Sequence, residues 1–344
     1  PTPDDLTRQA LADLLEVELV LDEECLARLE EFFRRRGRHM AQANRIQVMF
    51  PQGSCQVDNE IGTAPGIRAE VGESLVICMP GVPDEMRAMF ESSVVDLIPA
   101  CPVVMAVRIL RVYGLGESSL SEQLSDILSD RQGDAVVGTT VADGLISLTI
   151  TASADSESGA SDLADKIAEE LTSRLGSLII GTGSDTPASV VAGLLLDRKQ
   201  TLSLAESCTG GMVGEMITSL SGASDYFLGS AVCYANTAKR AILGVSEKVL
   251  DNCGAVSEKV AREMAQGARR KFASDWAISL TGIAGPGGGS PDKPVGLVFI
   301  GLSGPNVDQV FRHVFTSNRE QIRHRAALAA LNHLRGALLG DELV

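Results

Sequence analysis

The stretch Ala205-Glu206-Ser207-Cys208-Thr209-Gly210-Gly211 is the most informative part of this sequence. A predicted strand at 201–205 leads into it and a predicted helix at 211–220 follows, which indicates a turn from a strand into a helix. Small residues in such a turn expose backbone N–H groups, and with the helix dipole these make a site for a phosphate or an oxyanion. The simpler alternative is a tight turn that needs glycine only for its backbone geometry.

A second glycine-rich loop, TGIAGPGGG at 281–289, follows the predicted strand 276–280. In a parallel-type sheet, loops at the carboxyl ends of neighbouring strands converge on one cleft. The loop has neither the G-K-[ST] of a Walker A motif nor the spacing of a dinucleotide fingerprint, and a flexible surface loop is the alternative. Strands and helices alternate throughout 187–340, which predicts an α/β/α sandwich.

Three residues between the two loops are candidates for chemistry: Ser224, Tyr234 and Lys239. A serine nucleophile needs a base, and a lysine that is desolvated in a pocket can serve as one. Taken singly, Ser224 would be a turn residue, Lys239 a solvated helix residue and Tyr234 a core residue. The four histidines all fall outside residues 40–312, which makes a serine–histidine pair less convenient.

The remainder of the chain predicts two further units. Residues 4–40 have the spacing of two helices, and residues 44–99 have that of strands, turns and a helix. Residues 101–183 follow the order β-α-β-β-α-β, which is typical of a small α+β domain. A Gly/Ser/Pro-rich linker at 181–187 then marks a boundary.

Composition limits the partners and the compartment. The chain has 344 residues, with 30 Lys+Arg against 45 Asp+Glu, and this acidic balance argues against a nucleic-acid partner. No window approaches the ~18 uncharged apolar residues of a membrane span. Seven cysteines without C-x-x-C spacing suggest neither a disulfide framework nor a zinc site, so a reducing cytoplasm is expected.

Several separated motifs in residues 187–340 resemble those of the CinA C-terminal (PncC-type) domain, the nicotinamide-mononucleotide deamidase family. They are AESCTGG at 205–211, SGAS at 221–224, the Tyr234/Lys239 segment, GAVS at 254–257 and TGIAGPGGG at 281–289. The resemblance implies hydrolysis of the carboxamide of nicotinamide mononucleotide to nicotinate mononucleotide and ammonia, without a cofactor. It further implies Ser224 as the nucleophile, Lys239 as its general base and Tyr234 as a supporting proton donor or orienter.

The same resemblance implies a set of substrate-binding residues. They are Ser207, Thr209, Gly210, Gly211, Thr281, Gly282 and Gly285, for the substrate or its oxyanion. Arg319 and Arg323, at the start of the last predicted helix, are candidates for the ribose phosphate, and a solvated helix face is the alternative for each.

The first part of the chain resembles the same family. PTPDDLT at 1–7, NRIQ at 44–47, Asn59 with GTAPG at 62–66, and PGVPDEM at 80–86 look like the second half of its molybdopterin-binding-like domain. Residues 101–183 look like its KH-like linker domain. The expected domains are therefore 1–100, partial molybdopterin-binding-like; 101–183, KH-like; and 187–340, deamidase, in an α/β chain whose C-terminal sheet is mixed. The family's glycine-rich run and earlier strands are expected upstream of Pro1.

The N-terminal resemblance implies a second activity, a divalent-metal-dependent ADP-ribose pyrophosphatase. Asp4 and Asp5 would hold the metal, because cations such as Mg²⁺ favour carboxylate oxygens beside phosphates; a helix cap is the alternative. A non-catalytic role in competence or DNA-damage responses is a further alternative. The overall expectation is a cytoplasmic homodimer that binds a pyridine nucleotide and neither nucleic acid nor membrane.

Overall fold

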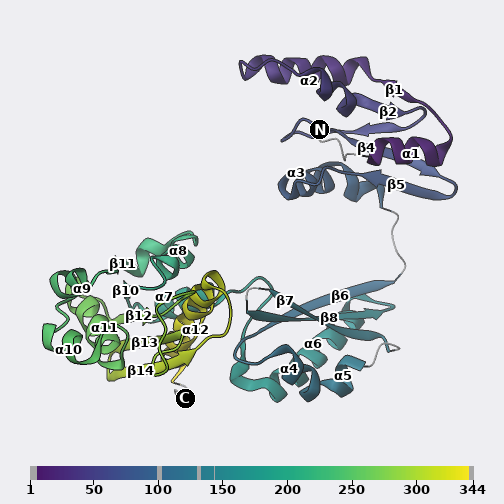
Figure 1. The fold of residues 1–344 in the computed structure, drawn as a ribbon. Coiled ribbons are helices and arrows are strands. Elements are labelled where there is room, and N and C mark those ends of the chain that lie inside the picture. Colours follow the sequence, from purple (N-terminus) through teal and green to yellow (C-terminus); the bar gives the residue numbers. More distant parts are fainter. Residues whose placement is uncertain (1–5, 99–102, 130–132, 143, 341–344) are drawn as a thin grey trace. The chain divides into compact units, whose positions relative to one another are not determined.

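The computed structural model describes residues 6–98, 103–129, 133–142 and 144–340. The chain divides near residue 101 into two compact units, which are described separately. Figure 1 shows the elements of each. Within the described residues, no helix is long and apolar enough to cross a membrane.

The described part of the N-terminal unit combines two small antiparallel sheets with three α-helices. Its elements are α1 (Thr7–Leu15), β1 (Leu19–Leu21), α2 (Glu23–Arg35), β2 (Met49–Pro51), β3 (Cys55–Val57), β4 (Gly66–Val71), β5 (Ser74–Cys78) and α3 (Pro83–Met89). The sheets have the orders β1-β2 and β3-β4-β5. The Asp22 side chain caps α2 by accepting the N–H of Cys25 at 2.9 Å, which explains where that helix begins.

The second unit opens with a four-stranded antiparallel sheet. Its elements are β6 (Val104–Val112), α4 (Glu117–Gln123), α5 (Ser125–Ser129), β7 (Ala135–Ala142), β8 (Leu145–Ala154), α6 (Glu157–Leu175) and β9 (Ile179–Thr182); this is the predicted β-α-β-β-α-β order, except that the first helix is divided into α4 and α5. The strand order is β7-β8-β6-β9. Helices α4, α5 and α6 lie on one face of the sheet (Figure 1), where Leu148 and Ile150 of β8 are fully buried.

The rest of the second unit is the predicted α/β/α sandwich. Its elements are α7 (Pro187–Arg198), β10 (Leu202–Glu206), α8 (Met212–Thr218), β11 (Phe227–Val232), α9 (Asn236–Leu243), α10 (Glu247–Cys253), α11 (Glu258–Phe272), β12 (Trp276–Gly282), β13 (Leu297–Gly304), β14 (Val307–Val314) and α12 (Arg319–Leu339). The sheet order is β11-β10-β12-β13-β14. Strands β11, β10 and β12 are parallel to one another. Strand β13 runs antiparallel to β12, and β14 runs antiparallel to β13, so the sheet is mixed.

Consecutive residues of β10 pack into the two opposite layers. Leu204 belongs to the core shared with α7, α8 and α12, whereas Ala205 belongs to the core shared with α9 and α11. Both side chains are fully buried, as expected for a central strand covered on both faces. The burial of β10 fixes the position at which the chain leaves the sheet, directly before Ser207.

Candidate active site

The two glycine loops leave the sheet at the same edge, as the sequence predicted. Glu206 of β10 lies beside Leu280 of β12 in a parallel register, and the N–H of Ser207 donates to the carbonyl of Leu280 at 3.0 Å. The turn 207–211 and the loop after Gly282 therefore begin side by side at the carboxyl ends of their strands, where ligands of α/β sheets bind.

Lys239 contacts several groups at the carboxyl ends of these strands. It comes from α9 and is 1% exposed. Its Nζ lies 2.9 Å from Ser207 Oγ, 2.9 Å from the carbonyl oxygen of Cys233 and 3.1 Å from that of Tyr234. Among the described residues, no carboxylate forms an ion pair with it. Burial therefore lowers the pKa of Lys239 from its usual value of 10.5, because the charged form loses its water.

The predicted Ser224–Lys239 pair does not form in the described chain. Ser224 is exposed in a short 3₁₀ turn (Ala223–Asp225) at the amino end of β11, whereas the amine of Lys239 lies at the carboxyl end, beside the Cys233 carbonyl. At ~3.3 Å per strand residue, the two ends of β11 are roughly 20 Å apart. The hydroxyl that meets Lys239 is that of Ser207, which is 7% exposed.

The predicted anion site at the start of α8 is already filled by the chain itself. Glu206 is fully buried, and its carboxylate accepts the N–H groups of Gly211 at 2.9 Å, Val213 at 3.2 Å and Gly214 at 2.9 Å. Ser230 of β11 donates a further hydrogen bond, 3.3 Å long. Glu206 therefore takes three of the N–H donors at this helix end and acts as the internal anion that shapes the turn.

The two arginines of α12 both reach the edge that carries Ser207. Arg319 donates to the carbonyl of Gly285 at 2.7 Å and to the hydroxyl of Tyr234 at 3.2 Å. Arg323 donates to the carbonyl of Thr209 at 2.6 Å. Tyr234 is 65% exposed. The alternative prediction, that this tyrosine is a core residue, is therefore wrong. Two positive charges thus lie beside the glycine loops, contributed by a helix that follows both loops in sequence, 34 residues after Gly285 and 114 after Thr209.

The remaining predicted substrate-binding residues differ in whether their polar groups are already hydrogen-bonded within the chain. Thr209 is fully buried and its Oγ1 has no hydrogen-bond partner among the described atoms. Thr281, also buried, donates from Oγ1 to the carbonyl of Ala255 at 2.8 Å and so holds the 254–257 segment against β12. Gly211 has φ +100°, a left-handed conformation that favours glycine.

Close backbone approach explains two more of these glycines. A Cβ on Gly282 would lie 2.7 Å from the carbonyl oxygen of Leu297, and one on Gly285 would lie 2.5 Å from Val295 Cγ1. Gly210 has φ +64° in the turn, and its N–H donates to the carbonyl of Ser207. These positions shape the two loops through their backbones.

The sequence alone did not assign a role to Glu206 or to Cys233. Glu206 fixes the turn, and the Cys233 carbonyl holds the amine of Lys239. The sequence pattern that could have identified Glu206 is an acidic residue shortly before the Gly210-Gly211 pair that begins a helix. A negative charge at a helix N-terminus is stabilising. The neighbouring Cys208 is a poor nucleophile, because burial raises the pKa of its thiol to about 11.

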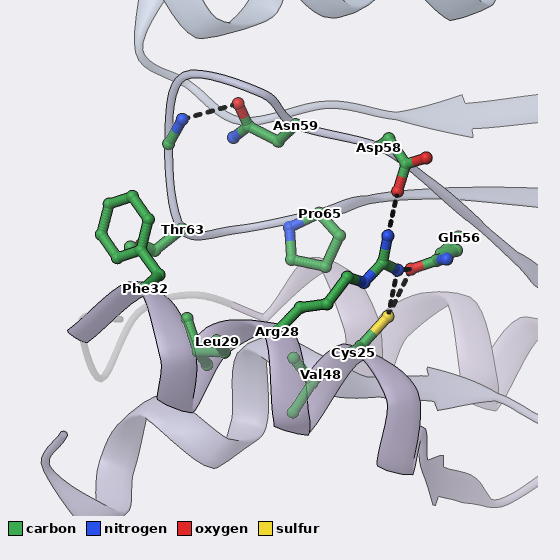
Figure 2. A pocket seen from close by; sticks show the side chains of 11 residues that line it. Cys25, Arg28, Leu29, Phe32, Val48, Gln56, Asp58, Asn59, Thr63 and Pro65 are labelled. Atoms are coloured by element: carbon green, nitrogen blue, oxygen red, sulfur yellow. Dashed lines mark hydrogen bonds and ion pairs between the residues drawn. The ribbon is translucent and has the colours of Figure 1, made fainter. Parts of the chain in front are cut away.

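The N-terminal unit has a pocket of its own, shown in Figure 2. Arg28 lies along its floor and donates to Asp58 at 2.9 Å and to the sulfur of Cys25 at 3.3 Å. Asn59 accepts the N–H of Gly62 at 2.8 Å and closes the loop above. The pocket has a volume of about 130 Å³, and its one acidic group, Asp58, is neutralised by Arg28.

The predicted metal ligands Asp4 and Asp5 lie outside the described residues. Within the part of the chain that is described, no three His, Cys, Asp or Glu side chains are grouped so that they could hold a metal ion. The assignment of Asp4 and Asp5 therefore stays a prediction.

Family models match three consecutive segments of the chain. Residues 1–100 match a model described as a probable molybdopterin binding domain, residues 107–181 match the damage-inducible protein CinA KH domain, and residues 184–338 match the CinA C-terminal domain. The order and extents of these matches agree with the elements described above.

Relatives match almost the whole chain. It is 42% identical to a CinA-like protein from Nostoc punctiforme, over 98% of this chain and 83% of the relative. It is 41% identical to a CinA-like protein from Gloeothece citriformis, over 98% and 82%. A solved structure, the competence damage-inducible protein A from Klebsiella pneumoniae, is 30% identical and covers 44% of this chain and 95% of its own, with a TM-score of 0.44. With relatives this similar along nearly its entire length, the chain belongs to the CinA family.

Proposed function

We propose that the C-terminal domain hydrolyses the carboxamide of nicotinamide mononucleotide, with Ser207 as the nucleophile and Lys239 as its general base. The proposal keeps the reaction expected from the sequence and the predicted base, and it replaces Ser224 with Ser207. Support for the replacement comes from the 2.9 Å separation of Ser207 Oγ and Lys239 Nζ inside a buried site. Hydrogen-bond reach between a nucleophile and a base is the geometric signature of an activated serine.

The surroundings of the amine suit a neutral lysine. A neutral amine has two N–H donors and one lone pair, and two of the three oxygen partners, the carbonyls of Cys233 and Tyr234, can only accept. The two N–H groups therefore serve the carbonyls, and the lone pair faces the hydroxyl of Ser207. Because burial lowers the pKa of Lys239, this neutral form is reached at a lower pH than in water.

In the first half of the reaction, Ser207 Oγ attacks the carboxamide carbon and its proton passes to Lys239 Nζ. The carbonyl oxygen becomes an oxyanion, for which the N–H groups of Cys208 and Thr209 are the backbone donors beside the nucleophile, since those of Ser207, Gly210 and Gly211 already have acceptors. The lysine then gives the proton to the amide nitrogen, the C–N bond breaks, and ammonia leaves. The product of this half is a nicotinoyl ester on Ser207.

In the second half, water replaces the serine. Lys239 takes a proton from the water as its oxygen attacks the ester carbon, and returns the proton to Ser207 Oγ as the C–O bond breaks. The product is nicotinate mononucleotide, and the enzyme regains its starting state. No step needs an oxidant, a reductant or a metal ion to balance.

The positive side chains at the rim suit a mononucleotide. Since Glu206 takes three of the N–H donors at the start of α8, the 5′-phosphate would be held by Arg319 and Arg323, whose guanidinium groups lie beside the Gly285 and Thr209 carbonyls. A guanidinium that already donates to one carbonyl keeps other N–H groups for a phosphate. The exposed hydroxyl of Tyr234, hydrogen-bonded to Arg319, lies within the same group and would orient the substrate.

The experiment is ammonia release from nicotinamide mononucleotide by the full chain, with and without a chelator. We expect chelator-resistant release that falls by at least about 10³-fold in Ser207→Ala, as for other removed nucleophiles. Ser224→Ala is the matched control, because it deletes the same hydroxyl from an exposed turn, and it should keep the wild-type rate. Turnover that survives in Ser207→Ala but is lost in Ser224→Ala would reverse the assignment.

A further inference from the structure

The segment 253–257, between α10 and α11, carries the GAVS motif, to which the proposed reaction gives no role. The carbonyls of three consecutive residues in this segment each accept a hydrogen bond from a side chain. The pairs are Cys253 with Lys293 Nζ at 2.7 Å, Gly254 with Ser257 Oγ at 2.9 Å and Ala255 with Thr281 Oγ1 at 2.8 Å. Thr281 lies near the end of β12 and Lys293 in the loop that follows, so this part of the chain holds the segment at two points.

The loop 283–296 joins β12 to β13 and contains the glycine run 287–289. It is closed at its base, where the N–H of Ile283 donates to the carbonyl of Leu297 at 2.8 Å and the N–H of Gly296 donates to the carbonyl of Ile283 at 2.7 Å. All residues from 286 to 292 are exposed. Because glycine has more backbone freedom than any other residue, the conformation of this exposed part depends on the contacts at its two ends.

Cationic side chains make contacts at both ends of the exposed part. Arg319 of α12 donates to the carbonyl of Gly285 at 2.7 Å, and Lys293 donates to the carbonyl of Cys253 at the end of α10. The backbone of Lys293 belongs to a tight turn, in which the N–H of Ser290 donates to its carbonyl at 2.8 Å and its own N–H donates to the carbonyl of Ser290 at 3.1 Å. The amine of Lys293 therefore connects this turn to the end of α10.

The amine of Lys293 is seated closely against the 253–257 segment. A Cβ on Gly254 would lie 3.2 Å from Lys293 Nζ, so glycine at this position leaves room for the amine. A lysine on a free surface keeps its charged end in water and its side chain mobile. Lys293 instead gives up side-chain freedom to reach one carbonyl, which is the behaviour of an anchoring contact.

The two ends of the exposed part are coupled by the packing of Gly285 against Val295. A Cβ on Gly285 would lie 2.5 Å from Val295 Cγ1, and Val295 is two residues after Lys293. Close-packed groups transmit displacements, so a shift at Lys293 reaches the Gly285 carbonyl. Arg319 donates to this carbonyl and, at 3.2 Å, to the hydroxyl of Tyr234, so the guanidinium takes its position from the loop.

We propose that Lys293 is a positioning residue of the active site. Its hydrogen bond to the Cys253 carbonyl holds the loop 283–296 in the conformation in which Gly285 places Arg319 for the phosphate of the substrate. Lys293 acts through Arg319 and not on the reacting atoms. Its role toward the phosphate rests on the proposed function, whereas the anchoring of the loop does not.

The first test is the kinetics of the full chain with Lys293→Met, which keeps the unbranched stem and removes the amine. We expect KM for nicotinamide mononucleotide to rise by about fivefold, the effect of losing one hydrogen bond, with little change in kcat. KM for nicotinamide riboside, which has no phosphate, should change little. Lys293→Arg keeps N–H donors on a long cationic side chain and should restore the low KM. Lys259→Met, on the exposed surface of α11, is the matched control.

A double variant tests the route through Arg319. If Lys293 acts through Arg319, Lys293→Met should add nothing to the KM increase of Arg319→Gln, because the group that it positions is already absent. Three results would each overturn the role toward the phosphate: additive effects on log KM, a wild-type KM in Lys293→Met, and an equal rise of KM for nicotinamide riboside.

The anchoring of the loop is measured without substrate, as the rate at which proteinase K cleaves the full chain between residues 286 and 292. Exposed loops of small residues are cleaved when they open, so the rate reports the open fraction. We expect this rate to rise about fivefold in Lys293→Met and to keep its wild-type value in Lys293→Arg and Lys259→Met. An unchanged rate in Lys293→Met would overturn the inference. A wild type that does not hydrolyse nicotinamide mononucleotide, with faster cleavage in Lys293→Met, would contradict the proposed function and support the anchor.

Discussion

The amine of Lys239 lies 2.9 Å from the hydroxyl of Ser207, although 32 residues separate them in sequence. They come together because β10 and β11 are parallel neighbours, with Glu206 beside Val232 at their carboxyl ends. The serine begins the turn after one strand, and the lysine belongs to the helix after the other. A buried amine and a hydroxyl at this distance are the two groups that the proposed reaction uses.

Replacing Lys239 by methionine should abolish turnover and leave substrate affinity nearly unchanged. Methionine keeps the unbranched apolar stem but has no lone pair for the Ser207 proton, so we expect kcat to fall by about 10³-fold or more with little change in KM. Lys248→Met, on the exposed surface of α10, is the matched control. Circular dichroism would verify the fold of both variants. Near-normal kcat in Lys239→Met would remove the lysine from the mechanism.

The succession of helices and strands was largely readable from the sequence. Apolar periodicity and capping residues predict where most helices and strands begin and end to within a few residues. Examples of such caps are Asp22 before α2 and Ser257 before α11, each followed by an acidic first turn. Helix α10 was missed because it is short and only Leu250 of its seven residues is buried. Such a helix has no apolar stripe for a pattern to detect.

The resemblance implied Lys239 as the base, but the serine hydroxyl that its amine contacts could not be read from the sequence. Lys239 follows a strand and precedes apolar helix positions, which places it at a carboxyl edge; several serines lie in similar small-residue turns. Ser224 precedes β11 whereas Ser207 follows β10, and only the parallel register of these strands decides which hydroxyl the lysine reaches. The preference of α/β sheets for ligands at carboxyl ends would have favoured Ser207.

The reaction should show a rising pH dependence set by Lys239. Only the neutral amine can accept the Ser207 proton, so log(kcat/KM) should rise with slope one and level off above the pKa of Lys239 in the free enzyme. Burial lowers that pKa below 10.5, and the inflection should therefore lie below this value. An inflection at or above 10.5 would contradict a buried, desolvated base.

The same shift affects stability, with a sign that can be checked separately. The unfolded chain holds the lysine proton up to its usual pKa of 10.5, whereas the folded chain releases it earlier. Between the two pKa values the unfolded state binds more protons, so the lysine makes folding less favourable at lower pH and this penalty is relieved as pH rises. Lys239→Met should remove this contribution to the pH dependence of the unfolding free energy, and Lys248→Met should leave it in place.

Glu206→Gln should lower both stability and kcat. The carboxylate accepts N–H groups on both oxygens, and in glutamine one of them becomes an NH₂ that faces backbone donors. A buried group left unsatisfied costs about 1–3 kcal/mol, and the turn that carries Ser207 would shift. Glu215→Gln, exposed on the same helix α8, is the control. If denaturant unfolding and kcat of Glu206→Gln both match the wild type, Glu206 does not position the turn.

Arg319→Gln should weaken binding of the phosphate more than it slows chemistry. The guanidinium lies at the rim, bonded to the Gly285 carbonyl and the Tyr234 hydroxyl, and does not contact the Ser207 hydroxyl. We expect KM for nicotinamide mononucleotide to rise by about tenfold or more, since a charged hydrogen bond is worth ~1.5–3 kcal/mol. KM for nicotinamide riboside, which has no phosphate, should change little. Arg312→Gln on the exposed side of β14 is the control; equal effects on both substrates would place the phosphate elsewhere.

The stability of the C-terminal domain should fall in acid because of a histidine pair. His313 and His333 share a hydrogen bond, with their Nε2 atoms 2.8 Å apart, and the His333 ring stacks on Phe311 at 3.6 Å. Burial, and then the charge of His313, lower the pKa of His333 to about 3, and burial also lowers that of His313. The pair is therefore neutral in the folded domain at pH values where an unfolded histidine becomes charged.

The sign follows from proton uptake. Between about pH 6.5 and pH 3 the unfolded state binds more protons, so the unfolding free energy decreases as pH falls, by up to about 1.4 kcal/mol per pH unit for each proton. His333→Phe, which keeps an aromatic ring against Phe311, should flatten this dependence, and His39→Phe, at an exposed position of the other unit, should not. Trp276, the only tryptophan of the chain and 4% exposed within this domain, reports the transition by its fluorescence. An unchanged acid slope in His333→Phe would mean that other groups take up the protons.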